Sequence, residues 1–317
     1  MLKVIFIYIF LFLISSDILA QCFSSPGNPI GGTANLGSVE KKLLRISAFH
    51  KYSLSDYYLE GHKNSDFILY DCADMNFIGS IIAYGLTDKF TLETELGYFI
   101  NKTIYYDKRL VLPEYKSKGN GFSNSVISAK YSLYFNPDKR IKYTLSAGVK
   151  IPFSTEPQYV NNALLPMDVQ PSTGTYGTVI QSYLLKENSL KGMRYFLINR
   201  VEINTENKQE YQFGNVFITS LFVSKHLHFR WQWLTENWTA ILQVRHEYRT
   251  KSKNRDIEVG SSGSNLLYLS PQLNYTIKEK WNVSVIADIP LYQYYYGTQL
   301  ANKFAIGFNL TRDILFK

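Results

Sequence analysis

The sequence of 317 residues predicts an all-β fold, an up-and-down antiparallel transmembrane β-barrel of about 12 strands with short periplasmic turns and longer extracellular loops. Three observations predict it: an export signal at the N-terminus, charged residues on one side of segments with a period of two, and connections that alternate between short and long. Composition agrees, because 25 Tyr and 20 Phe beside 10 Pro and 2 Cys favour strands over a disulfide scaffold. A mean hydropathy of −0.15 also fits, since half of each barrel strand is polar.

The N-terminus, "MLKVIFIYIFLFLISSDILAQC", has the pattern of a secretory signal peptide. Its apolar run over residues 4–14 is too short to span a bilayer as a helix. We expect a signal peptide over residues 1–20, cleaved after Ala20, and a mature chain that starts at Gln21. The alternative is a lipoprotein acylated on Cys22, although glutamine is a poor residue before such a cysteine. No later segment has the ~18 to 20 apolar residues of a spanning helix, so a membrane form would be a barrel.

Twelve candidate strands follow, and the connections between them carry the topology. Short connections at 86–89, 136–140, 187–192 and 278–280 interleave with longer polar ones at 54–71, 105–120, 154–172, 251–264 and 295–301. This alternation is typical of an outer-membrane barrel, and an even strand number returns the C-terminus to the periplasmic side. The strands are expected at residues 43–53, 72–85, 90–104, 121–135, 141–153, 173–186, 193–204, 211–224, 238–250, 265–277, 281–294 and 302–312.

Charged residues share one side of the clearest strands. In "IKYTLSAGVKIPF" the lysines alternate with apolar residues, and "WTAILQVRHEYR" and "FTLETELGYFI" behave in the same way. An unpaired ion in a dry interior costs several kcal/mol, so we expect the charged side to face the lumen and the apolar side to face lipid. The charged residues expected to line the lumen are Lys142, Lys150, Arg194, Arg200, Arg245, Arg249, Glu93, Glu95 and Glu247, with Arg45, Lys51, Lys130, Glu202 and Asp288 in the wider set.

Some segments fit the pattern poorly. The connection 225–237 is long for a periplasmic turn, and strands two, six and eight alternate weakly, so their registers are uncertain. Pro271 falls inside strand ten, where its missing N–H must be absorbed by a bulge or a kink in the wall.

The chain divides into a signal peptide at 1–20, an N-terminal segment at 21–42 and a barrel at 43–317. The segment 21–42 is rich in Gly, Ser, Pro and Asn, and it is either a disordered periplasmic leader or a plug of the lumen. A disulfide between Cys22 and Cys72 would require the leader to pass upward through the barrel, which ~20 residues at about 3.3 Å each can do. Two cysteines in an exported protein often pair, so this disulfide is a hypothesis.

Four segments together resemble a family of outer-membrane barrel proteins. They are "SSPGNPIGGTANLG", "GLTDKFTLETELGYFINKT", "YSLYFNPDKRIKYTLSAGVKIPFS" and "VIADIPLYQYYYGTQLANKFAIGFNL". Members of that family are labelled transporters or outer-membrane proteins of the phenol-degradation meta pathway. The resemblance implies a barrel with a passive uptake role and an unspecified substrate, and it transfers no catalytic or ligand residues.

Three functions are considered from the sequence. The first is passive diffusion of small solutes, with nine Lys or Arg against five Asp or Glu in the lumen favouring anions, or a kink at Pro271 admitting apolar solutes. Its alternative is a lumen filled by a rigid network of ion pairs. The second is a lipid hydrolase. No histidine inside a predicted strand has a serine two positions away on the same face, and His246, on the predicted outer face beside the upper rim, is the one to test. The third is a structural or surface-binding barrel.

The sequence also predicts partners. The basic and aromatic loop 105–120 suits outer-membrane lipid or lipopolysaccharide, and an outer-membrane barrel implies the barrel-assembly machinery and a small solute. Nucleic acid is not expected for an exported chain. The segment "YDCADMN" offers only one thiol beside two carboxylates, and we expect no metal and no cofactor. The protein is not expected to be an enzyme.

Overall fold

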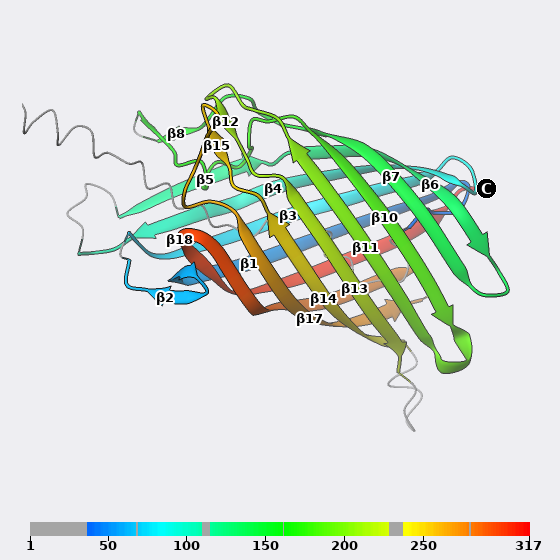
Figure 1. The fold of residues 1–317 in the computed structure, drawn as a ribbon. Helices are drawn as coiled ribbons and strands as arrows, with labels where there is room; N and C mark the ends of the chain where they lie inside the picture. The colour runs from blue at the N-terminus through cyan, green and yellow to red at the C-terminus, as the bar shows by residue number, and fades with distance from the viewer. Residues whose placement is uncertain (1–36, 68, 110–114, 161, 228–236, 279) are drawn as a thin grey trace, which may run out of the picture.

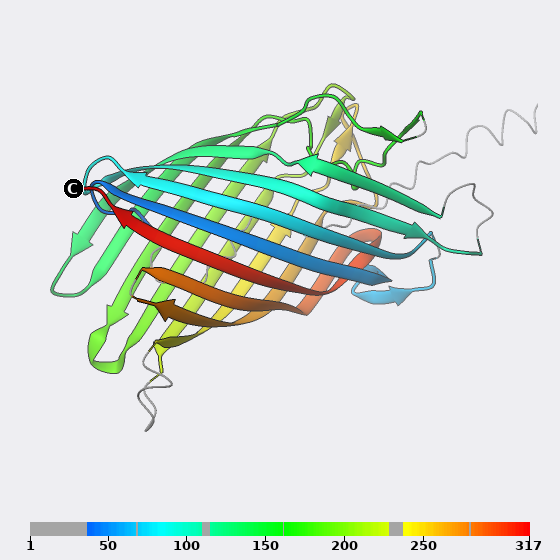
Figure 2. The same cartoon turned by 180° about the vertical axis from the view of Figure 1, so that it is seen from behind.

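A computed structural model describes the chain except for residues 1–36, 68, 110–114, 161, 228–236 and 279. Antiparallel strands form one sheet that curves round and closes on itself (Figures 1 and 2). Among the described residues, no helix is long and apolar enough to cross a bilayer. The elements are β1 (Leu43–Gly61), β2 (Lys63–Ser65), β3 (Tyr70–Gly85), β4 (Phe90–Tyr106), β5 (Lys116–Phe122), β6 (Ser125–Asn136), β7 (Ile141–Ile151), β8 (Tyr159–Val160), β9 (Ala163–Leu164), β10 (Gly177–Asn188), the 3-10 turn η1 (Ser189–Lys191), β11 (Met193–Asn204), β12 (Tyr211–Gln212), β13 (Val216–His226), β14 (Trp238–Arg249), β15 (Lys253–Asn254), β16 (Ile257–Glu258), β17 (Ser264–Ile277) and β18 (Trp281–Leu315).

The last element, β18, closes the barrel by crossing the wall twice. Its residues 281–295 pair with β17, and its residues 298–315 pair with β1. The chain reverses at Gly297, whose φ of 72° suits a residue without a side chain. At the opposite end the N–H of Asp313 donates to the carbonyl of Lys280 at 3.4 Å, so the two halves of β18 lie side by side. With β18 counted as two crossings the wall has the twelve that the sequence predicted, and the predicted fold class is confirmed.

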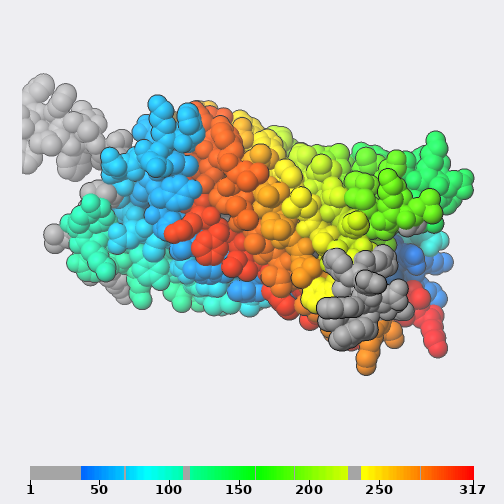
Figure 3. Space-filling model, turned by 90° about the horizontal axis from the view of Figure 1, so that it is seen from below, coloured from blue at the N-terminus to red at the C-terminus, as the bar shows by residue number. Residues whose placement is uncertain are grey.

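The short connections gather at one end of the barrel. Residues 86–89, 137–140, 189–192 and 278–280 join neighbouring strands there, close to the predicted positions. Leu43 lies opposite Leu315 at the same end. We call this the turn end and the opposite one the loop end. In Figure 3 the blue N-terminal strands meet the orange and red C-terminal strands along one face, as the pairing of β1 with β18 requires.

At the loop end the strands reach further than predicted. β1 continues to Gly61 and β4 to Tyr106, although 54–71 and 105–120 were expected to be loops. Part of the second loop is the strand β5, which pairs with the upper part of β4. The connections 152–176, 205–215 and 250–263 contain the short strands β8, β9, β12, β15 and β16.

The outer surface of the wall is apolar, as the period of two predicted. Exposed aliphatic and aromatic side chains cover neighbouring strands, which is the surface that a barrel presents to lipid. In water a band of this extent would be an aggregation hazard. Examples are Ile78, Ile82, Leu92, Leu96, Ile127, Leu145, Val149, Ile180, Leu221, Leu242, Val285, Ile306 and Phe308.

The interior is less polar than the charged side of the strands suggested. One cluster of buried side chains comprises Phe49, Met75, Phe77, Phe99 and Ile286, and a second one comprises Tyr183, Phe196, Ile198, Phe222 and Ile241. Two glycines make room for the first cluster. A Cβ on Gly79 would lie 2.2 Å from the ring of Phe49, and a Cβ on Gly97 would lie 2.2 Å from the ring of Phe77. Large apolar side chains therefore fill part of the lumen.

Pro271 lies in β17 and does not interrupt the pairing of β17 with β14. It lies opposite Leu242, and that register is unbroken. On the β18 side the described register passes from Gln272 opposite Ile286 to Leu269 opposite Ile289, and it shifts by one residue between Leu267 and Tyr268. The register is the same on both sides of Pro271, and Ser270 and Pro271 have no ladder partner among the described residues of β18, which accommodates a residue without an N–H.

Candidate functional site

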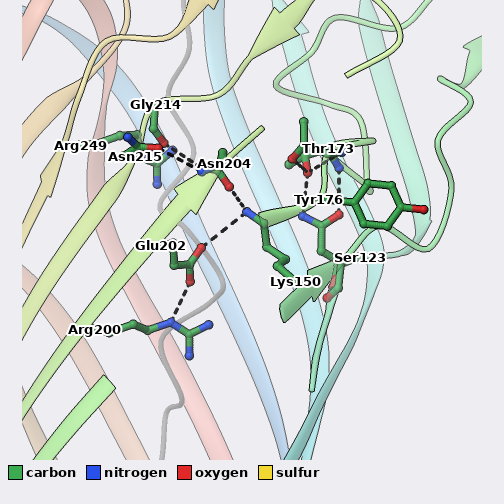
Figure 4. Close-up of polar contacts among 12 residues, drawn as sticks. Ser123, Lys150, Thr173, Tyr176, Arg200, Glu202, Asn204, Gly214, Asn215 and Arg249 are labelled. Atoms are coloured by element: carbon green, nitrogen blue, oxygen red, sulfur yellow. Dashed lines mark hydrogen bonds and ion pairs between the residues drawn. The ribbon is translucent and has the colours of Figure 1, made fainter. Parts of the chain in front are cut away.

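A chain of ion pairs runs along the inner wall between β4, β7 and β11. Arg200 lies between two carboxylates, with its Nη1 2.7 Å from Glu95 Oε1 and its Nε 2.7 Å from Glu202 Oε1. Lys150 Nζ is 3.7 Å from Glu202 Oε2 and donates to the side chain of Asn204. Figure 4 shows Lys150 pointing between Glu202 and Asn204, with Arg200 beyond Glu202. Alternating charges at this spacing satisfy one another although they are buried.

A second network centres on Asp288. Its Oδ2 is 3.0 Å from Lys51 Nζ and 3.2 Å from Arg245 Nη2, and its Oδ1 accepts from Ser270 Oγ at 2.6 Å. The guanidinium of Arg245 also lies 4.4 Å from the ring centroid of Tyr268. Four strand crossings are linked by this one carboxylate.

A third pair joins β4 to β6. Lys130 Nζ is 2.6 Å from Glu93 Oε2 and 4.6 Å from the ring centroid of Tyr183. Lys51, Lys130, Arg200 and Arg245 each have 2% of their surface exposed, so these cations lie in a packed interior. The lumen thus contains the paired network that the sequence left as an alternative to an open polar channel.

The remaining predicted charges lie elsewhere along the lumen. Lys142 lies near the turn end, where it donates to the carbonyl of Ser38 at 3.1 Å. Arg194 pairs with Glu187 at 2.9 Å beside the turn end and is 43% exposed. Arg249 pairs with Glu247 at 3.2 Å near the loop end.

A cavity of about 170 Å³ occupies the loop end of the lumen. On one side it is lined by Phe49, Phe77 and Phe99. On the other it is lined by the first ion network and by Arg249, which Figure 4 shows beside Gly214 and Asn215. Cations outnumber anions in the lining, with Lys102, Lys150, Arg200 and Arg249 against Glu95, Glu202 and Asp168.

The cavity is covered by residues 165–173, which we call the roof loop. All of it except residue 173 belongs to the predicted loop 154–172, but it folds into the mouth instead of projecting away from it. Val169 is fully buried, and with Leu165 it packs against side chains of β1, β3, β4 and β18. Gly119 of β5 permits this approach, since a Cβ there would lie 2.0 Å from the carbonyl of Val169. The apolar run "ALLPMDV" at 163–169 was the sequence signal for this burial.

Hydrogen bonds fix the roof loop in place. The side chain of Gln170 donates to the carbonyls of Leu165 at 2.9 Å and Gln158 at 3.1 Å and accepts from the N–H of Gln158 at 2.8 Å. Lys102 Nζ donates to the carbonyl of Gln170 at 3.0 Å. Lys102 was not predicted to line the lumen, because it becomes inward-facing through a register shift between β4 and β5 that the sequence does not reveal.

Asp168 places a titratable group in the roof loop. The side chain is half-buried and lines the cavity, where Lys102 and Arg249 face it. Burial raises the pKa of Asp168 to about 8, against the opposing effect of these two cations. At neutral pH the excess of positive charge in the cavity is therefore larger than the count of side chains suggests.

At the turn end the described end of the leader enters the lumen. Val39 is buried, and its N–H donates to Thr91 Oγ1 at 3.0 Å. Residues 1–36 lie outside the described part of the chain, so the plug and the fate of Cys22 remain predictions. The alternation along β3 places Ala73 and Met75 inside the barrel and Cys72 on its outer side, away from the route that a leader threaded through the lumen would take.

The single histidine favoured for hydrolysis lies on the outer wall. His246 Nε2 is 2.8 Å from Asn265 Oδ1. Within the described residues no group of three His, Cys, Asp or Glu side chains could hold a metal ion.

Comparison with known proteins places the chain among outer-membrane barrels. A family model described as "Putative MetA-pathway of phenol degradation" matches residues 92–289, more than half of the chain. An outer-membrane channel from Pseudomonas putida F1 is similar in structure, with a TM-score of 0.66 and 10% identity over 92% of this chain and 100% of that one. This similarity shows that the chain has the fold of an outer-membrane β-barrel.

Two further structures are less similar. The KdgM porin has a TM-score of 0.41 and 10% identity over 84% of this chain and 98% of that one. The β-domain of the Bordetella autotransporter BrkA has a TM-score of 0.47 and 8% identity over 86% of this chain and 100% of that one. No curated protein matches the sequence.

Proposed function

This chain belongs to the family of the MetA-pathway of phenol degradation, and we propose that it is a passive channel through which small solutes cross the outer membrane. The observation that supports this function is the cavity at the loop end of the lumen, lined by charged side chains of the wall and covered by the roof loop. Side chains fill the middle of this closed barrel, so solutes can cross it only through a narrow pathway between them.

The pathway begins at the cavity and passes the ion networks toward the turn end. The roof loop narrows it at one end, and residues 37–40 of the leader narrow it at the other, beside Thr91 and Lys142. Positive charge in the cavity favours anions. The similar Pseudomonas putida protein is an outer-membrane channel, which is consistent with this function.

Conductance of the purified protein in planar lipid bilayers tests the proposal. The mature chain is expected to give small single-channel currents, and deletion of residues 21–39 is expected to increase them by removing the segment that contacts Thr91 and Lys142. A variant that keeps the leader but carries Glu258→Gln at the exposed tip of a loop is the control and should conduct like the unaltered protein. Absence of current in every form would contradict the channel.

We also propose that the chain is exported and cleaved after Ala20. The intact mass of protein from isolated outer membranes is expected to start at Gln21, whereas a lipoprotein would carry acyl chains on Cys22. Lipopolysaccharide around the wall and the barrel-assembly machinery are the partners that an outer-membrane barrel requires in this proposal.

A further inference from the structure

The size of the cavity limits what it can hold. Its volume is about 170 Å³. An apolar protein cavity of about 150 Å³ binds benzene. The space at the loop end therefore suits one six-membered ring with a small substituent, and a disaccharide or a peptide would not fit in it.

The apolar side of the cavity is suited to a ring. The ring centroids of Phe77 and Phe99 lie 4.8 Å apart, and those of Phe49 and Phe77 lie 5.9 Å apart. Met75 is fully buried and also lines the cavity. Aromatic rings and a thioether make favourable contacts with a bound ring. Small hydrophilic ions would leave this side without contacts.

The opposite side contains an arginine with an unused donor. Arg249 Nη2 donates to Glu247 at 3.2 Å, but its buried Nε has no hydrogen-bond partner among the described residues. Arg200, by contrast, is matched by two carboxylates. A buried N–H without a partner is costly, and an arginine binds a carboxylate more strongly than a neutral hydroxyl. Arg249 therefore has capacity for an anionic ligand.

We propose that this cavity binds a monocarboxylate whose apolar body is a single six-membered ring, with the ring against Phe77 and Phe99 and the carboxylate toward Arg249. This names the substrate class of the channel and rests on the proposed function. A neutral phenol of the same size would make the ring contacts but would offer no anionic acceptor to the unpaired Nε–H of Arg249. Acetate would match the charge and leave the aromatic side empty.

Titration calorimetry of the mature protein in detergent at pH 6.5, with benzoate, phenol and acetate as the probes, tests the proposal. Benzoate is expected to bind about tenfold or more tightly than either of the others. Arg249→Gln is expected to weaken benzoate by about tenfold and to leave phenol unchanged, a pattern that general loss of structure would not produce. Arg312→Gln, at the turn end where Arg312 lies 4.6 Å from the ring of Trp281, is the matched control and should bind benzoate normally.

Folding of each variant is checked by the change in gel mobility that heat causes in barrels. If Arg249→Gln fails to fold, Arg249→Lys retains the charge and is expected to keep the preference for benzoate over phenol.

Equal affinity for benzoate and acetate, equal affinity for benzoate and phenol, or no saturable binding of benzoate would each overturn the inference. Channel currents without preferential benzoate binding would contradict the proposed binding site but support the proposed channel function. Preferential benzoate binding without currents would support the binding site but contradict the channel function.

Discussion

Asp288 shows how a single residue holds the interior together. It accepts from Ser270 and pairs with the ammonium of Lys51 and the guanidinium of Arg245, and all of these side chains are buried. Removing one partner from a buried ion network leaves a buried charge uncompensated. This lowers the free energy of unfolding far more than losing an exposed ion pair does.

Asp288→Asn is therefore expected to lower the free energy of unfolding by about 3 to 5 kcal/mol, because Lys51 and Arg245 would share no carboxylate. The measurement is urea unfolding of the protein in detergent micelles. Asp56→Asn is the matched control, since its pair with Lys303 is largely exposed, and it should cost at most about 1 kcal/mol. Equal effects of the two substitutions would contradict the network.

Asp168 gives the cavity a pH dependence of definite sign. Its pKa is raised to about 8 by burial, so the carboxyl is neutral at pH 6.5 and charged at pH 9.5, facing Lys102 and Arg249. Ionisation of Asp168 lowers the net positive charge of the cavity as pH rises through this range, and preference for anions falls with it.

The reversal potential in a salt gradient is the measurement for Asp168. We expect anion preference to decrease between pH 6.5 and 9.5 in the unaltered protein and to change much less in Asp168→Asn, which stays neutral throughout. A pH dependence that is the same in both proteins would show that another group titrates there.

At the scale of the element, the roof loop is the part that the sequence described least well. Strands and turns follow from a local period of two and from polar connections, so 86–89 and 278–280 were located closely. The direction in which a long connection folds depends on contacts distant in sequence, such as Val169 with the wall and Gly119 with the carbonyl of Val169. An apolar run in a loop could indicate burial, but not which surface receives it.

Val169→Asp tests whether the roof loop narrows the mouth. A carboxylate in the cluster of Leu165 and Ile104 would cost several kcal/mol, so we expect the loop to leave its place and single-channel conductance to rise about twofold. Leu164→Asp is the matched control, because Leu164 is 45% exposed in the same connection. A rise in both variants, or in neither, would contradict the assigned position of the roof loop.

Over the whole molecule, the sequence predicted the barrel and which side of each strand is charged. The ion-pair partner of each charged residue could be identified only from the structure. The inward positions of Arg200, Arg245 and Glu247 followed from alternation. Their pairing follows from cross-strand register, which bulges such as the one beside Lys102 change by a residue. The apolar side of the lumen was missed because strand β3 lacks a clean alternation: Met75 and Phe77 lie inward, while the opposite face mixes Asp74 and Asn76 with Ile78.

The central claim is that solutes cross the barrel through the cavity beneath the roof loop. Met167 lines this cavity, so Met167→Cys in a background of Cys22→Ser and Cys72→Ser places a single thiol on the pathway. The decisive measurement is single-channel current in planar bilayers before and after a bulky anionic methanethiosulfonate reagent is added. We predict that the current falls in Met167→Cys and is unchanged in Glu258→Cys, at an exposed loop tip. Current that persists unaltered in a fully modified Met167→Cys protein would contradict the account.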